Sequence, residues 1–183
     1  MREVQLITSN LGKLREFQAA LEPLGYVVVH LPLEVEEIQA DTLEEVVVDC
    51  IRQIRAKKVK DFIVDDSGLF VDALKGFPGV YSSYALRTLG CEGLLKLMEG
   101  VPDRSARFEC CIGCSLEGRK DIILTERCQG GIIHSMRGQG GFGFDPVFAA
   151  KGEVRTFAEM PLEEKNLISH RGKAIKSLAR QLR

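Results

Sequence analysis

Apolar and polar positions change from strand-like to helix-like spacing at the beginning of the chain. Residues 4–7 form a short apolar run, and the polar stretch 8–13 follows it. Apolar side chains then recur at helical spacing from residue 14 to residue 21, where Pro23 and Gly25 close the pattern. This order predicts a strand, a polar loop and a helix.

The same alternation continues to residue 68. Residues 26–31 are rich in β-branched side chains, which predicts a second strand. Thr42 and Glu45 have the spacing of a capping box, so a helix with an apolar face is expected after residue 42. The apolar residues 62–64 predict a third strand that leads directly into the acidic sequence Asp-Asp-Ser-Gly.

The second half of the chain has a different pattern. Residues 94–98 indicate a short helix, and strand-like segments 107–116 and 121–128 flank a hairpin turn, Glu-Gly-Arg-Lys. A glycine-rich loop follows, and the tail 161–183 is predicted to be helical. An α/β beginning with a hairpin-rich middle predicts the α/β class with a mixed sheet. The length of 183 residues suits one domain, or two lobes that share one sheet.

Composition narrows the possible partners. Apolar residues make up 45% of the chain and charged residues 28%, and the formal net charge is −1. Nucleic-acid binding is not expected, because such proteins carry a basic excess. An anionic ligand is therefore expected to be small. No apolar run approaches the roughly 18 residues of a membrane helix, so no membrane contact is expected. The strand pattern begins at the N-terminus without a signal peptide, which predicts a cytoplasmic protein.

Six cysteines are scattered along the chain. Cys111 and Cys114 have the CxxC spacing that is found in zinc and redox sites. However, they lie in a strand-like segment, and no second pair completes four zinc ligands. Buried, reduced thiols are the favoured interpretation, because a free cysteine behaves as a small core residue.

The polar loop 8–13 is the first candidate for chemistry. It precedes a predicted helix, and a helix N-terminus presents free backbone N–H groups and a positive dipole end to a phosphate. Gly12 permits close approach of a ligand, and Lys13 adds positive charge. The alternative is simple capping of the helix by a polar side chain.

The second candidate is the acidic pair Asp65 and Asp66. Carboxylates at the end of a strand lie where α/β sheets usually bind ligands. They can bind Mg²⁺, or one of them can deprotonate an attacking water. One of the upstream acids at positions 34, 36 and 37 can complete a metal site. The alternative is a solvated Asp-Ser-Gly turn.

The third and fourth candidates lie in the last quarter of the chain. Phe142 and Phe144 flank a glycine and precede Asp145, an arrangement that suits stacking on a nucleobase. The alternative is an aromatic loop that covers the core. Lys165 and Arg171 offer positive charge and a guanidinium fork for phosphate or a purine edge, or they belong to a charged helix surface.

Taken in order, these stretches resemble the inosine triphosphate pyrophosphatase family. The matching blocks cover nearly the whole chain. They are Thr8-Ser9-Asn10-Leu11-Gly12-Lys13, Glu37-Ile38-Gln39, Val64-Asp65-Asp66-Ser67-Gly68-Leu69, Phe77-Pro78-Gly79-Val80-Tyr81-Ser82, Phe142-Gly143-Phe144-Asp145-Pro146, Thr156-Phe157-Ala158-Glu159-Met160, Lys165-Asn166 and Ser169-His170-Arg171.

The resemblance implies a Mg²⁺-dependent enzyme that converts ITP, dITP and XTP to the monophosphate and pyrophosphate. It implies a long, twisted mixed sheet flanked by helices, in two lobes with a central cleft, and a homodimer. The implied catalytic residue is Asp66, and the implied metal ligands are Glu37, Asp65 and Asp66. The implied substrate-binding residues are Thr8, Ser9, Asn10, Leu11, Gly12, Lys13, Ser67, Phe142, Gly143, Phe144, Asp145, Lys165, His170 and Arg171.

The chain departs from the family pattern in two places. Asp49 and Cys50 stand where many members carry a lysine in the second helix, so either Arg52 or Lys57 substitutes for it, or one phosphate contact is missing. Many members also have Ser-Ala-Arg after Pro-Gly-Val-Tyr. Here the sequence is Ser-Ser-Tyr, and Arg87 is the nearest replacement for the charge.

Three other functions remain as alternatives. One is a nucleotide-binding regulatory module without activity, which the intact acids disfavour. Another is a related enzyme for modified pyrimidine nucleotides such as dUTP. A kinase is the least favoured, because the chain has neither a Walker loop nor protein-kinase signatures.

Overall fold

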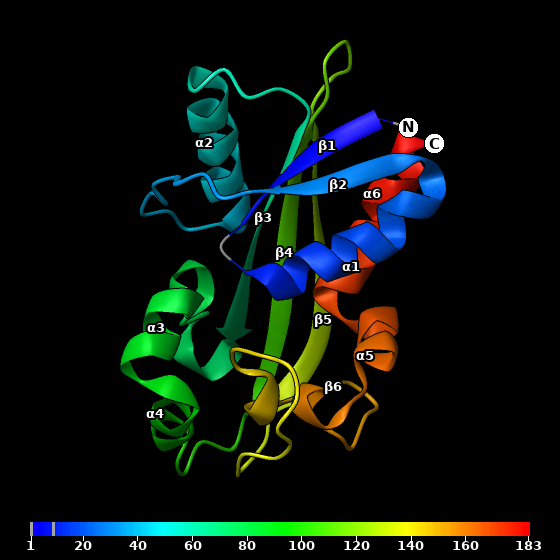
Figure 1. Ribbon diagram of the computed structural model, residues 1–183. Helices are drawn as coiled ribbons and strands as arrows, with labels where there is room; N and C mark the ends of the chain where they lie inside the picture. The colour runs from blue at the N-terminus through cyan, green and yellow to red at the C-terminus, as the bar shows by residue number, and fades with distance from the viewer. Residues whose placement is uncertain (1, 9) are drawn as a thin grey trace. The chain divides into compact units, whose positions relative to one another are not determined.

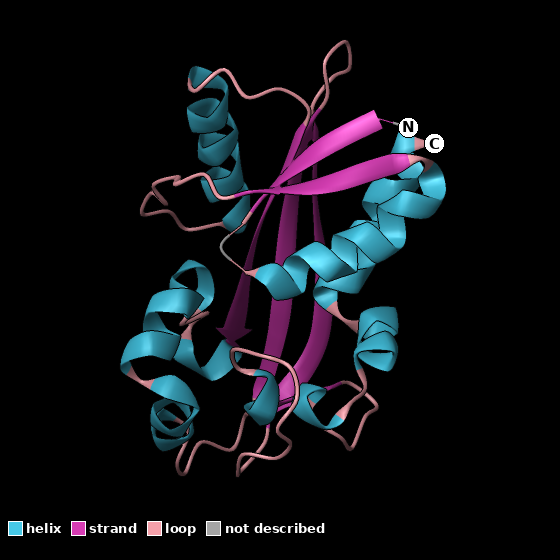
Figure 2. Cartoon of the chain, viewed as in Figure 1, coloured by secondary structure: helices cyan, strands magenta, loops and turns pink. Residues whose placement is uncertain are grey.

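The computed structural model describes residues 2–8 and 10–183, so the prediction for Ser9 lies outside the described residues. It contains both helices and strands and confirms the α/β class (Figure 2). The strands are β1 Arg2–Ile7, β2 Tyr26–Leu31, β3 Phe62–Val71, β4 Ser105–Ser115, β5 Ile122–Ile132 and β6 Phe148–Ala150. The α-helices are α1 Leu11–Leu21, α2 Leu43–Ala56, α3 Ser82–Thr88, α4 Gly90–Leu97, α5 Leu162–Ile168 and α6 His170–Leu182. Short 3₁₀ turns are η1 Glu22–Leu24, η2 Asp72–Leu74, η3 Gly79–Tyr81, η4 Asp145–Val147 and η5 Phe157–Glu159.

The strands form one six-stranded sheet in the order β2-β1-β3-β4-β5-β6. β1 pairs in parallel with both β2 and β3, whereas β5 pairs antiparallel with β6. The sheet is therefore mixed, as the sequence pattern predicts.

The chain divides into two compact units. Unit 1 consists of Met1–Asp66, Cys110–Glu126 and Gly172–Arg183, and unit 2 consists of Ser67–Glu109 and Arg127–Arg171. β3, β4 and β5 each contribute residues to both units. The cleft that the family resemblance implies stays a prediction.

Unit 1 is built around alternating faces of β4. Cys110, Ile112 and Cys114 share one apolar core with the inner sides of α1 and α6. The opposite face meets α2, and Figure 1 shows α2 on the other side of these strands from α1 and α6. Gly113 allows this close packing, because a Cβ there would lie 2.7 Å from atoms of Val47 and Ile51.

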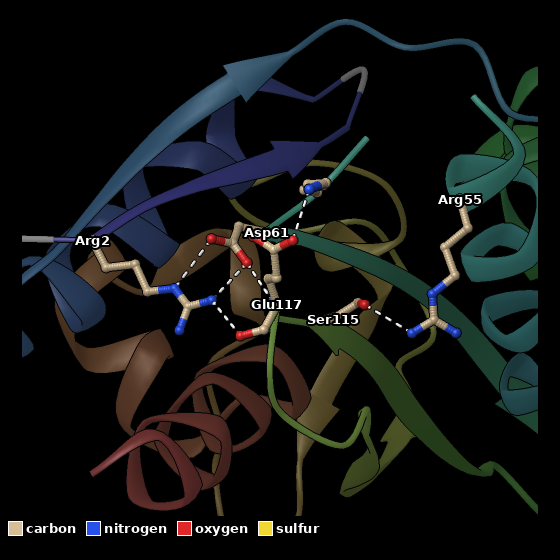
Figure 3. A network of polar contacts seen from close by, with 6 residues as sticks. Arg2, Arg55, Asp61, Ser115 and Glu117 are labelled. Atoms are coloured by element: carbon tan, nitrogen blue, oxygen red, sulfur yellow. Dashed lines mark hydrogen bonds and ion pairs between the residues drawn. The ribbon is translucent and has the colours of Figure 1, made fainter. Parts of the chain in front are cut away.

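A polar network joins the beginnings of β1 and β3 to the end of β4 (Figure 3). The Arg2 guanidinium donates to Asp61 at 2.7 and 3.1 Å and to the Glu117 carbonyl at 3.0 Å. Asp61 Oδ1 also accepts from the Glu117 backbone N–H at 2.6 Å. Arg55 of α2 donates to Ser115 Oγ at 3.0 Å. These bonds hold the ends of β1, β3 and β4 together and attach the C-terminal end of α2 to β4.

Unit 2 has its own aromatic core. The Phe108 ring stacks on the Phe157 and His170 rings, at centroid distances of 5.9 and 4.7 Å, and meets the Phe148 ring edge-on at 4.7 Å. α3 and α4 follow one another and contribute further apolar side chains to this core. Ser82, at the beginning of α3, is buried, accepts from the Leu69 N–H and donates to the Gly79 carbonyl.

Two sequence predictions about these elements are wrong. Asp65 and Asp66 do not follow a strand or form a turn, because they lie in the middle of the ten-residue β3. Gly68 continues this strand, and glycine is needed there because a Cβ would meet the Gly79 carbonyl oxygen at 2.3 Å. The tail is not one helix, because the chain is extended at Ser169 (ψ 157°) between α5 and α6. In the chain outside Met1 and Ser9, no helix is long and apolar enough to cross a membrane.

Candidate active site

A cavity of about 910 Å³ lies in unit 1 beside the middle of β3. Charged and polar side chains from four parts of the sequence line it together with a few apolar ones. The lining residues are Ile7, Thr8, Lys13, His30, Pro32, Leu33, Glu34, Val35, Glu36, Glu37, Val46, Cys50, Gln53, Lys57, Val64, Asp65 and Asp66. The cavity thus brings together Thr8 and Lys13 of the predicted phosphate loop, the predicted metal-site acid Glu37 and the acidic pair of β3.

Lys13 and Asp65 form an ion pair in the wall of this cavity. Lys13 Nζ lies 3.2 Å from Asp65 Oδ2 and 3.3 Å from the Asp65 carbonyl oxygen. The Asp65 side chain is fully buried, whereas 16% of the Lys13 side chain is exposed. Asp65 Oδ2 also accepts a weak bond from the Cys110 thiol at 3.8 Å. The Lys13 side chain is thus partly exposed at the cavity, whereas the Asp65 side chain is enclosed.

The loop before α1 satisfies much of its own backbone. Asn10 is the N-cap of α1, and its Oδ1 accepts from the Gly12 N–H at 2.8 Å. Thr8 Oγ1 accepts from the Asn10 N–H at 3.1 Å, and the Thr8 carbonyl accepts from His30 Nε2 at 2.7 Å. The capping alternative is therefore confirmed for Asn10. Phosphate binding by residues 8–13, including the exposed Leu11, stays a prediction.

Glu37 and Asp66 both act on the environment of Cys50. Burial is the main cause that raises the pKa of the Cys50 thiol, and the negative charges of Asp66 and Glu37 raise it further, to about 12. Both carboxylates are hard oxygen donors, as Mg²⁺ requires. Among residues 2–8 and 10–183, no group of three or more His, Cys, Asp or Glu side chains is placed so that it could hold a metal ion. Mg²⁺ usually binds one or two carboxylates plus water and substrate phosphate, so the donor set fits this ion. Asp65 as a third ligand stays a prediction.

The structure also shows what occupies the place of the missing lysine in α2. Asp49 accepts a hydrogen bond from Gln53 and pairs with Arg52, whose side chain is 77% exposed. Lys57 lines the cavity and donates to the Glu34 carbonyl at 3.0 Å. Of the two expected substitutes, Lys57 is the one that lies at the cavity.

A second predicted group comes together in unit 2. Lys165 Nζ donates to Asp145 Oδ2 at 2.6 Å, and both side chains are only 4% exposed. The same oxygen accepts from the Phe142 backbone N–H at 2.8 Å. The Lys165 ammonium lies 4.8 Å from the centroid of the Phe142 ring, whose residue is 39% exposed. Asp145 therefore holds both the lysine and the aromatic loop in place.

Arg171 approaches the Phe142 ring as well. Its guanidinium carbon lies 5.3 Å from the ring centroid, and its Nη2 donates to Ser67 Oγ at 3.0 Å. His170 is buried in a stack with Phe108. The interpretation as a charged helix surface is wrong for Lys165 and Arg171, because both are buried. Cations beneath a partly exposed ring form a surface suited to a flat, electron-rich base.

The remaining residues of the aromatic loop contact other parts of unit 2. Phe144 is buried in the core of unit 2, and the Gly143 carbonyl accepts from the Cys91 thiol at 3.5 Å. Gly141 has a φ of +69°, and a Cβ there would lie 2.1 Å from Asp145 Oδ2. The covering-loop alternative therefore describes Phe144, while Phe142 is the exposed ring. Substrate contacts by Gly143, Phe144 and His170 stay predictions.

A comparison with known protein families matches residues 4–181 to the Ham1 family. The chain belongs to the Ham1 family. This Ham1 chain is 49% identical to the dITP/XTP pyrophosphatase of Pyrococcus horikoshii over 96% of its own length and 94% of the relative. It is also 49% identical to the dITP/XTP pyrophosphatase of Thermococcus kodakarensis, over 97% and 95%. The solved Ham1 protein of Staphylococcus aureus superposes with a TM-score of 0.87 at 32% identity, covering 99% and 98%.

At the second departure of this Ham1 chain from the family pattern, replacement of the charge by Arg87 stays a prediction. Arg87 lies over the ring of Tyr84, with its guanidinium carbon 5.7 Å from the centroid, on the surface of α3.

Sequence reasoning missed Gln53, which lines the unit 1 cavity. It also missed the Asp145–Lys165 pair, because no local pattern relates two residues that are 20 positions apart. The spacing of Asp49, Gln53 and Lys57 at every fourth residue is the signal that points to Gln53.

Proposed function

We propose that this Ham1-family chain is a nucleoside triphosphate pyrophosphatase that hydrolyses ITP, dITP and XTP to the monophosphate and pyrophosphate. The observation that carries the proposal is the convergence of Lys13, Glu37 and Asp66 on one cavity. Full-length similarity to enzymes named dITP/XTP pyrophosphatase supports the same reaction and the same substrates.

The chemistry assigns separate tasks to the cavity residues. Glu37 and Asp66 would hold Mg²⁺, which would supply positive charge to the phosphate oxygens. Asp66 accepts a proton from water as the water oxygen attacks the α-phosphorus. The bond from this phosphorus to the bridging oxygen breaks, and pyrophosphate leaves with the bond electrons. Lys13 stabilises the charge on the phosphates.

The aromatic group of unit 2 is proposed to select the base. Phe142 stacks on the purine, and the buried Lys165 and Arg171 are hydrogen-bond donors without acceptor capacity. Hypoxanthine and xanthine present an oxo group at position 6, which accepts hydrogen bonds. Adenine presents an amino group there, so its binding would leave buried donors unmatched, and this costs affinity.

A cytoplasmic homodimer completes the proposal. The six free cysteines, five of them buried, are in keeping with a reducing compartment. The homodimer rests on the family resemblance of the sequence. Sedimentation velocity of the purified chain tests it, with a mass near twice 20.3 kDa expected and a single-chain mass contradicting it.

A panel of triphosphates tests the proposed reaction. Purified protein is incubated with ITP, XTP, dITP, GTP, ATP and dUTP in Mg²⁺ buffer and in EDTA, and the products are separated by anion exchange. The expected products from ITP, XTP and dITP are monophosphate and pyrophosphate, in Mg²⁺ only. Equal turnover of ATP contradicts the base selection, preferred cleavage of dUTP indicates the pyrimidine alternative, and binding without cleavage indicates the regulatory module.

A further inference from the structure

One polar stripe of α2 faces the acidic loop that lines the unit 1 cavity. Asp49, Gln53 and Lys57 follow one another at intervals of four residues, which places them on the same side of the helix. Gln53 and Lys57 both line the cavity, together with the loop residues Glu34, Glu36 and Glu37. The stripe stands where the family pattern has a helix lysine, and its contacts to the loop are specific.

Gln53 makes the closest of these contacts. Its side-chain Oε1 accepts from the Glu36 backbone N–H at 3.0 Å, and its Nε2 donates to the Glu36 carbonyl at 2.6 Å. A single amide therefore pairs with both backbone polar groups of one loop residue, as a neighbouring strand would. Residues 32–42 are outside helix and strand, so these bonds replace regular pairing for this part of the loop.

The orientation of the Gln53 amide is itself fixed. Nε2 donates a second hydrogen bond to Asp49 Oδ2 at 2.7 Å, one helical turn earlier. A carboxylate only accepts, so it selects the nitrogen side of the amide. One turn later, Lys57 Nζ donates to the Glu34 carbonyl at 3.0 Å. The loop is thus attached to α2 at two points on either side of Val35.

We propose that Gln53 is a positioning residue that holds the metal-site acid Glu37 in the cavity. Gln53 forms hydrogen bonds with both the N–H and the carbonyl of Glu36. These bonds hold the peptide that joins Glu36 to Glu37 in place. Glu37 then lines the same cavity as Cys50 and Asp66. The inference rests on the proposed function, because it assigns to Glu37 the role of a magnesium ligand.

The substitution Gln53→Met tests the inference, since methionine has a similar length and good helix propensity but cannot form the two bonds. Val48→Met, at an exposed position of the same helix, is the matched control. Two quantities are measured without nucleotide. They are the exchange rate of the Glu36 backbone amide by NMR and the Kd for Mn²⁺ by electron paramagnetic resonance. Circular dichroism and Tm report whether the variant is folded.

Loss of such an outer contact typically weakens metal binding by about 10- to 100-fold. We expect Gln53→Met to raise the Kd for Mn²⁺ by at least about tenfold and to accelerate Glu36 amide exchange, and Val48→Met to change neither by more than about twofold. A folded Gln53→Met with an unchanged Kd for Mn²⁺ overturns the inference while the proposed function stands. A wild-type chain that binds no Mn²⁺ and cleaves no ITP overturns both.

Discussion

The two candidate sites are each built on a lysine–aspartate pair, but the pairs differ in their surroundings. Lys13 Nζ lies 3.2 Å from Asp65 in the wall of a polar cavity, and the Lys13 side chain is partly exposed. Lys165 Nζ lies 2.6 Å from Asp145, and the rings of Phe142 and Phe157 cover the ammonium at 4.8 and 5.5 Å. The first pair is open on one side, and the second is enclosed.

The difference indicates different tasks for the same two residue types. An ammonium at a cavity can share its charge with a phosphate, while its aspartate keeps it in place. An enclosed pair gives little net stability relative to apolar residues, but removing one partner leaves a buried charge. In unit 2 that charge would be Asp145, which also anchors the Phe142 loop. Unit 1 is therefore suited to the chemical step, and unit 2 to a rigid binding surface.

The largest effect is expected from Asp66→Asn in unit 1. A general base typically contributes about 10²- to 10⁴-fold to turnover, so kcat for ITP should fall by that factor. Asparagine has nearly the same shape, and Asp66 is only half-buried, so Tm should change little. The assay is pyrophosphate release at saturating ITP, with thermal unfolding as the control. Turnover within threefold of the wild type would remove Asp66 from the chemical step.

The two lysines provide the most direct contrast in stability. Lys165→Met leaves Asp145 buried without its ammonium, and breaking such a pair costs about 3–5 kcal/mol. Lys13→Met also leaves a buried carboxylate, Asp65, but it should cost less, because Lys13 is partly exposed, the pair is longer and the cavity that Asp65 lines can admit water. Urea unfolding of both variants measures the free energies. Equal losses would show that the two pairs are not differently enclosed.

A further test is Phe142→Ala, in the exposed ring of unit 2. Base stacking is worth about 1–3 kcal/mol, so KM for ITP should rise by at least about fivefold. The chemical step in unit 1 should be preserved, so kcat should fall by less than about threefold. Steady-state kinetics with ITP separates the two parameters. A fall in kcat with unchanged KM would contradict the assignment of Phe142 to base binding.

The smallest effect is expected at a third pair, which lies outside both sites. Hydrogen bonding to Arg2 lowers the pKa of Asp61 below its ordinary value of 3.8. A lowered folded-state pKa stabilises the protein above the unfolded-state value, and this contribution disappears as the pH falls through the lower value. Asp61→Asn should therefore be slightly less stable than the wild type at pH 7. The difference should close below pH 3.8, as followed by urea unfolding at several pH values. A difference that widens in acid would contradict this sign.

Much of the fold follows from local sequence patterns. The strand at residues 26–31 and the capping box of Thr42 and Glu45 are both confirmed. The middle of β3 is not visible in the sequence, because Asp-Asp-Ser-Gly has the composition of a turn and only its neighbours in the sheet keep it extended. The break at Ser169 is hidden for a similar reason, since the apolar spacing of the tail continues across it.

The site was predictable in its residue types but not in its pairings. Lys13, Glu37 and the acidic pair of β3 line the unit 1 cavity, and Asp145, Lys165 and Arg171 lie around Phe142. The partners of Lys165 and Gln53 lie 20 and 17 residues away in the sequence, and periodicity carries no information at such separations. The polar stripe of α2 can be recognised by its helical spacing, but the loop that it holds has no regular pattern, so the pairing between them could not be predicted.

The assignment of the chemical step to unit 1 and of base binding to unit 2 is tested most directly by one set of kcat/KM values. Wild type, Asp66→Asn and Phe142→Ala are each measured with ITP and with ATP in Mg²⁺. We expect Asp66→Asn to lower both values by the same factor and to keep the ITP-to-ATP ratio. Phe142→Ala should reduce that ratio, because it removes the ring that holds the purine against the buried donors Lys165 and Arg171. A ratio that changes in Asp66→Asn but not in Phe142→Ala would contradict the account.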